Sequence, residues 1–178
     1  MKEKYCKAYF EDYANLTLKR YWNDYKDGFI NLDKPDLQNE KYSIGIEVVR
    51  ALDKKDGKAR SIFNNKDISN EEKAERCRKE KINHHIFDDF FAIFIGSSHS
   101  NENDTKIKDM YLKKIKKLNM NYKLFVTNGL FIILEPGFIN EINKLANDLH
   151  EISLKYKKKF DIVFIKLLNK LYIIKGLN

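Results

Sequence analysis

The chain has 178 residues, of which 43% are hydrophobic and two are prolines, so it is long enough to bury a core and unlike a disordered polypeptide. Its net charge of +8 favours a polyanionic partner such as nucleic acid, although solubilising surface lysines give the same balance. No apolar run approaches the roughly 18–20 residues of a membrane span, so no membrane association is expected. The first residues lack the apolar core of a signal peptide and the two cysteines form no metal-spaced pair, so we expect a cytoplasmic protein.

The first predicted element is a helix over residues 1–22, in which Tyr5, Tyr9 and Tyr13 recur at helical spacing. We expect this tyrosine stripe to pack on a sheet. The chain then changes to short apolar segments separated by turn residues, which is typical of strands. The predicted strands cover residues 28–32, 36–38 and 42–49, with a hairpin turn at residues 39–41.

The third of these strands carries a glutamate, Glu47, inside an apolar run. Glutamate is depleted in strands and an unpaired buried carboxylate is costly, so Glu47 needs a partner, for which a metal ion is the obvious choice. Side chains alternate between strand faces, so Gly45 and Glu47 share one face. An antiparallel register that sets Asp36 opposite Glu47 also sets Gln38 opposite Gly45. The predicted result is a concave patch of two carboxylates and one amide, in which the glycine leaves room for a ligand.

The remaining pattern alternates helices and strands, which predicts an α/β fold. We expect a single domain over residues 1–178, with a mixed central sheet flanked by helices and a C-terminal half of the order helix, hairpin, helix, hairpin. Its parts are a core helix and hairpin (1–66), a charged surface helix opened by a capping box at Ser69 (67–82), and a C-terminal α/β part (83–178). Within the last part we predict a buried strand at 90–95, a helix at 103–118, a hairpin at 124–134 that turns at Asn128-Gly129, a helix at 138–157, and strands at 160–165 and 170–174.

The order of a helix, a hairpin with Pro35-Asp36 and a strand with Glu47-Val48-Val49 resembles the core of the PD-(D/E)xK phosphodiesterase superfamily. Many restriction-type endonucleases and repair nucleases are members. The resemblance covers about residues 5–63. It implies a restriction-endonuclease-like core in which Asp36 and Glu47 bind Mg²⁺ or Mn²⁺, since hard oxygen ligands suit these ions. The implied activity is metal-dependent cleavage of nucleic-acid phosphodiester bonds.

The motif lysine of that superfamily is replaced here by Val49. Gln38 is therefore a further candidate catalytic residue, and a cation from elsewhere, such as Arg50 or Lys58, is another substitute for the lysine. Basic residues follow the acidic strand directly and are candidates for nucleic-acid binding: Arg50, Lys54, Lys58 and Arg60.

Two alternatives stay open beside the nuclease. The same fold could act by binding alone, for example as an inhibitor that a mobile element directs against a host defence nuclease, with a protein or nucleic-acid partner. An unrelated α/β domain, with Glu47 as a structural carboxylate, is the other. An ion pair from Glu47 to a lysine or arginine, under a patch capped by side chains, would favour the structural interpretation.

Overall fold

The computed structural model describes residues 2–51, 54–87, 90–93, 103–120, 122–134 and 138–177. The chain divides into two compact units, one formed by residues 1–51 and 102–178, the other by residues 52–101. In the described part, no helix is both long enough and apolar enough to cross a membrane.

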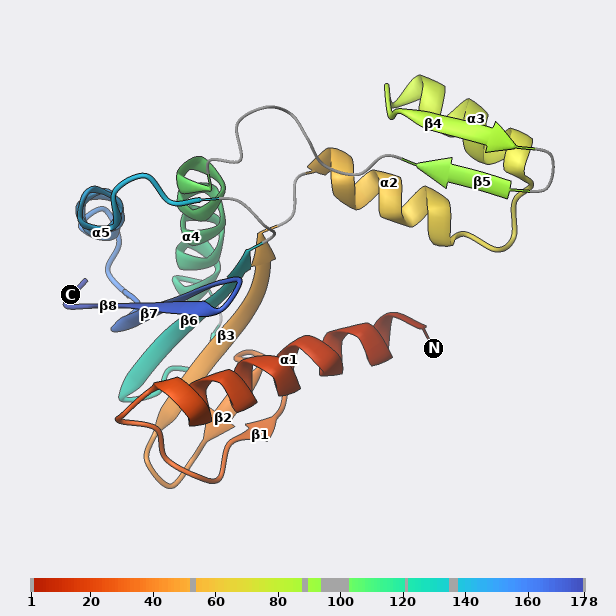
Figure 1. Ribbon diagram of the computed structural model, residues 1–178. Helices are drawn as coiled ribbons and strands as arrows, with labels where there is room; N and C mark the ends of the chain where they lie inside the picture. Colours follow the sequence, from red (N-terminus) through yellow and green to blue (C-terminus); the bar gives the residue numbers. More distant parts are fainter. Residues whose placement is uncertain are drawn as a thin grey trace. The chain divides into compact units, whose positions relative to one another are not determined.

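The first unit is built on a six-stranded sheet with the strand order β1-β2-β3-β6-β7-β8 (Figure 1). Its strands are β1 (Ile30–Asn31), β2 (Leu37–Asn39), β3 (Ile44–Ala51), β6 (Thr127–Leu134), β7 (Ile162–Leu167) and β8 (Lys170–Lys175). Its helices are α1 (Lys2–Tyr21), α4 (Asp104–Leu118) and α5 (Ile142–Ser153). Strands β3, β6 and β7 are parallel, whereas β2 and β8 pair antiparallel with their neighbours. The predicted α/β class and mixed sheet are confirmed.

Helix α1 covers one face of this sheet. Its buried side chains Ala14 and Leu18, with Trp22 directly after the helix, pack against apolar side chains of the central strands. The Trp22 ring meets the Phe164 ring edge-on at 5.0 Å. Of the predicted tyrosine stripe, Tyr9 is 64% exposed and Tyr13 is half-buried, so these two do not form the packed face. The Tyr5 side chain lies outside the described residues. Trp22 and the aliphatic side chains bury apolar surface at this contact, whereas tyrosine can keep its hydroxyl in water.

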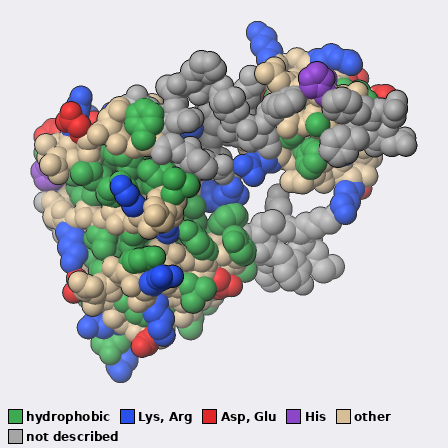
Figure 2. Space-filling model, viewed as in Figure 1, with side chains coloured by type: hydrophobic (Ala, Val, Ile, Leu, Met, Phe, Trp, Pro, Cys, Tyr) green, Lys and Arg blue, Asp and Glu red, His purple; other side chains and the backbone are tan. Residues whose placement is uncertain are grey.

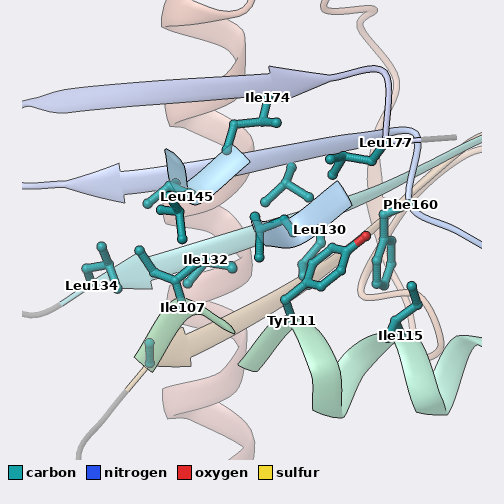
Figure 3. Packing of buried hydrophobic residues seen from close by; sticks show 14 of the residues in the cluster. Ile107, Tyr111, Ile115, Leu130, Ile132, Leu134, Leu145, Phe160, Ile174 and Leu177 are labelled. Atoms are coloured by element: carbon teal, nitrogen blue, oxygen red, sulfur yellow. The ribbon is translucent and has the colours of Figure 1, made fainter. Parts of the chain in front are cut away.

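Helices α4 and α5 cover the opposite face and enclose the larger core. Figure 3 shows Ile107, Tyr111 and Ile115 of α4 lying over Leu130 and Ile132 of β6. All five side chains are buried in this core. These α4 positions repeat at three- to four-residue spacing, so one stripe of the helix faces the sheet. The predicted helix at 103–118 is confirmed, and α5 is the shorter, ordered centre of the helix predicted at 138–157.

The second unit contains α2 (Lys54–Asn64), α3 (Asn70–Lys79) and a two-stranded sheet of β4 (His84–Phe87) with β5 (Phe90–Ile93). The Ser69 hydroxyl accepts a hydrogen bond from the backbone of Glu72, which confirms the predicted helix cap. Of the buried strand predicted at 90–95, Phe90–Ile93 lies in this small sheet and not in the central one, and residues 94–95 lie outside the described residues. Phe91 packs there into a core with Ala59, Ala74, Cys77 and Ile82.

The hairpin predicted at 124–134 is wrong, because Asn128-Gly129 does not turn. Both residues belong to the single strand β6, which lies between β3 and β7. The Asn128 side chain bonds the backbone N–H and carbonyl of Phe125, and its backbone N–H donates to Asp161. The asparagine is the second residue of the strand and ties the strand to the preceding loop. The C-terminal half is helix, strand, helix, hairpin, in which the final β7–β8 hairpin is as predicted.

Candidate active site

The β2–β3 hairpin has the predicted register. Gln38 pairs with Gly45, and the same register continued by two residues sets Asp36 beside Glu47. Asp36 accepts a 2.8 Å hydrogen bond from the backbone N–H of Val48, which fixes one carboxylate oxygen against β3. Asp36 is 4% exposed and Glu47 is 8% exposed. Two buried carboxylates therefore lie on the sheet face that α4 covers.

The other half of the predicted patch is filled. A Cβ atom at Gly45 would lie 2.4 Å from Cδ2 of Phe125 and 2.7 Å from Cγ of Pro35, so these rings occupy the space expected for a ligand. The Gln38 amide donates to the backbone carbonyl of Pro35 at 2.9 Å. Gln38 thus orders the loop that carries Asp36, and it does not line the cavity described below.

A lysine from α4 completes the site. The Lys114 ammonium forms an ion pair with Glu47, and both side chains are largely buried, at 13% and 10% exposed. Lys114 lies three residues after buried Tyr111, at the edge of the stripe that packs on the sheet. That position aims a long side chain from the helix toward β3. Val49, which stands in the motif position for lysine, instead packs against the hydrophobic core under α4.

The charges at this site oppose one another. Burial raises the pKa of Glu47, the Lys114 ammonium lowers it, and the negative charge of Asp36 raises it again. The net direction is upward, because desolvation disfavours the charged carboxylate more than one ammonium restores it. A second cation between the two carboxylates would offset this cost.

Asp36, Glu47 and Lys114 open onto one cavity of about 750 Å³. Exposed Lys34 and Lys117 lie at the same cavity and add positive charge. The complete lining is Asp33, Lys34, Asp36, Glu47, Val48, Lys114, Lys117, Met120 and Tyr122. The cavity is therefore acidic at its base and bordered by lysines.

The donor set suits a hard divalent cation. Mg²⁺ is commonly held by one or two carboxylates, while waters and substrate phosphates supply its other ligands. Asp36 and Glu47 provide two such carboxylates, and the pKa of Glu47 is raised by burial first and by the charge of Asp36 second. A bound cation would offset both effects. Among the described residues, no group of three or more His, Cys, Asp or Glu side chains is placed to hold a metal ion. An ion held by these two carboxylates would keep several positions for water or substrate.

Of the residues predicted to bind nucleic acid, Arg50 belongs to the first unit. Arg50 is on the α1 side of β3, where its guanidinium stands 4.2 Å from the centre of the Phe10 ring. Lys58 and Arg60 belong to α2 in the second unit, and Lys58 is paired with Glu80. Lys54 starts α2, but its side chain is outside the described part. In the space-filling view, lysine and arginine side chains are spread over both units (Figure 2).

Comparisons with known proteins gave no relative. A scan against protein-family models, a search of the curated proteins and a search of the solved structures each found no match. The resemblance to the PD-(D/E)xK superfamily stays a prediction from the residues themselves.

Proposed function

We propose that the chain is a metal-dependent nuclease that cleaves phosphodiester bonds at the cavity formed by Asp36, Glu47 and Lys114. The observation that carries the proposal is the meeting of two buried carboxylates and a largely buried lysine at one open cavity. These are the residue types of the PD-(D/E)xK motif, with the lysine supplied by α4 in place of Val49. A restriction-endonuclease-like core is part of this proposal.

Each side chain then has a defined role. Asp36 and Glu47 would hold Mg²⁺ or Mn²⁺, and the Val48 N–H keeps the Asp36 carboxylate in place. The bound ion would supply Lewis acidity toward the scissile phosphate and lower the pKa of a bound water. Lys114 places a positive charge where negative charge develops on the phosphate, which is the kind of preorganised contact that favours the transition state. Lys34 and Lys117 attract the polyanion to the cavity.

Cleavage of labelled DNA and RNA in Mg²⁺ or Mn²⁺ tests the proposal. The wild-type protein is expected to cut at least one of the two, and EDTA to stop it. Asp36→Asn and Glu47→Gln should each lower the rate by about a thousandfold, because loss of the metal removes several kcal/mol of charge stabilisation. Glu40→Gln is the matched control, since Glu40 is an exposed carboxylate on the same hairpin, paired with Lys123. Undiminished cleavage by both site variants would overturn the proposal.

The Glu47–Lys114 ion pair itself favours the alternative in which Glu47 is a structural carboxylate, and a domain of that kind would act by binding without catalysis. A lysine partner satisfies the Glu47 carboxylate with no metal, and the Gly45 half of the patch is capped by Phe125 and Pro35. Asp36 and Glu47 both line the cavity although this ion pair is formed, which is why we place the nuclease first. A wild-type protein that binds nucleic acid or a protein partner, and cuts neither DNA nor RNA with either metal, would support the binding protein.

A further inference from the structure

A groove lies beside the far end of α4, at the loop that leads into β7. Its volume is about 440 Å³, and three consecutive lysines, Lys157, Lys158 and Lys159, line it. None of the salt bridges found within the described ranges involves these three lysines. The carboxylate that lines the groove, Asp161, accepts hydrogen bonds from the backbone and side chain of Asn128. The groove is therefore strongly positive.

This groove is structurally joined to the end of α4. The Asn119 amide donates to the Lys158 carbonyl at 2.8 Å and accepts from the Lys158 backbone N–H at 2.9 Å. Lys114 precedes Asn119 on the same helix by five residues, which corresponds to about 7–8 Å along the axis at 1.5 Å per residue. Lys117 lies between them and lines the cavity of the candidate active site. Lysine side chains therefore line both the cavity, at Lys114 and Lys117, and the groove at the end of α4.

Apolar side chains stand exposed along the same path. Leu124 and Val126 line the groove and are 46% and 81% exposed, and Met120, which lines the active-site cavity, is 71% exposed. Such side chains can bury apolar surface against the faces of unstacked bases, whereas a duplex presents mainly its charged backbone to a surface of this kind. Lysines beside apolar side chains therefore match a single strand better than a duplex.

We propose that Lys117, Lys157, Lys158 and Lys159, with Leu124 and Val126, form a binding surface for a single strand of nucleic acid. The lysines contact its phosphates, and the apolar side chains contact its bases. The proposal rests on the nuclease function in one respect: the bound strand continues from this surface into the cavity of Asp36 and Glu47.

Binding is measured in EDTA, with a fluorescent oligothymidylate and with a duplex of equal length, so that the readout needs no cleavage. The triple variant Lys157→Gln, Lys158→Gln, Lys159→Gln is expected to bind the single strand about tenfold or more weakly at moderate salt. A plot of log affinity against log salt has a negative slope, and its magnitude should be smaller by about 2 in this variant. The figure follows from the loss of three phosphate contacts, which contribute roughly 0.7 each on a single strand. The control is the triple variant of Lys66, Lys144 and Lys170 to Gln, which removes the same charge from exposed positions outside the groove. It should bind like the wild type.

Equal loss in both triple variants would show a mere charge effect and overturn the proposal, as would tighter binding of the duplex than of the single strand. Hydrolysis of a small phosphodiester, bis(p-nitrophenyl) phosphate, separates this proposal from the nuclease function. The groove variant should retain that hydrolysis, because so small a substrate does not reach the groove. If the wild type binds the strand through the lysines but hydrolyses nothing, the surface is supported and the nuclease is not.

Discussion

Lys114 of α4 forms an ion pair with Glu47 of β3, 67 residues earlier in the chain. The pair exists because the crossover from β3 to β6 lays α4 over the sheet face that carries Glu47. It gives the acidic pair Asp36 and Glu47 the cation that Val49 cannot supply. Lys114 either neutralises a structural carboxylate or stabilises negative charge that develops on a phosphate. Substitution of Lys114 separates these two roles.

Replacement of Lys114 by Met should lower the rate of cleavage by about 100- to 1,000-fold, the usual effect of removing one preorganised charge from a transition state. Affinity for Mn²⁺ should be kept or increased, since a cation that competes for Glu47 is gone. The variant should also lose about 1–3 kcal/mol of unfolding free energy in the absence of metal, because Glu47 stays buried without its partner. Rate, Mn²⁺ titration and urea denaturation measure the three effects.

The control for this variant is Lys108→Met. Lys108 lies on the same helix and pairs with Asp148 of α5 at 3.0 Å, outside the cavity lining. It should cleave like the wild type. A Lys114→Met protein that keeps full activity, yet is destabilised, would mean that the ion pair serves the fold alone.

The stability of the metal-free protein should depend on pH through Glu47. Burial, followed by the charge of Asp36, raises the pKa of Glu47 above its ordinary value of 4.5, against the lowering effect of Lys114. A group of this kind contributes stability below its unfolded-state pKa and loses it as pH rises through the folded-state pKa. The unfolding free energy of the wild type should therefore fall relative to that of Glu47→Gln as pH is raised from about 4 to about 7. A difference that is constant or grows with pH contradicts the raised pKa.

Gly45 and Gly57 should respond oppositely to replacement by Ala. At Gly45 the new methyl group would lie 2.4 Å from the Phe125 ring, so Gly45→Ala should cost about 1–3 kcal/mol of unfolding free energy by overpacking. Gly57 is inside α2 with nothing within 4 Å of an added Cβ, so Gly57→Ala should gain up to about 1 kcal/mol. Urea denaturation measures both. If Gly45→Ala is neutral, Phe125 does not fill the space above Gly45.

Divalent metal should stabilise the folded chain. A ligand that binds only the native state at a hundred times its Kd adds about 2.7 kcal/mol, which raises the Tm of a protein of this size by several degrees. Mg²⁺ or Mn²⁺ should have this effect on the wild type and on Glu40→Gln, but not on Asp36→Asn. Equal shifts in all three proteins would place the metal elsewhere.

Local patterns were enough to predict the β2–β3 hairpin, but not its turn. The alternation of Gly45 and Glu47 is a property of neighbouring residues, and the pairing of Gln38 with Gly45 is the one that sets Asp36 beside Glu47. The turn predicted at residues 39–41 is wrong, because Asn39 pairs with Ile44 and the turn covers residues 40–43. The same kind of signal failed at Asn128-Gly129, because a hairpin dipeptide can also begin a strand when its side chain bonds the preceding loop. Local chemistry does not reveal which strand a segment will pair with.

The lysine of the candidate site was not predicted, because it depends on tertiary contacts. Its position beside Tyr111 on an amphipathic helix indicates that it lies at the edge of the packed stripe. Which strand lies beneath α4 follows only from the sheet order. Phe125, which fills the space above Gly45, is likewise distant in sequence and arrives through the loop before β6.

The most direct test of the metal site is a crystal structure of the protein soaked with Mn²⁺, with anomalous data collected at the manganese edge. We predict an anomalous peak between the carboxylates of Asp36 and Glu47, with the Lys114 ammonium moved away from the Glu47 oxygen that it contacts in the metal-free chain. An intact Glu47–Lys114 ion pair, with no anomalous peak at Asp36 under saturating Mn²⁺, would contradict a catalytic metal centre at this site.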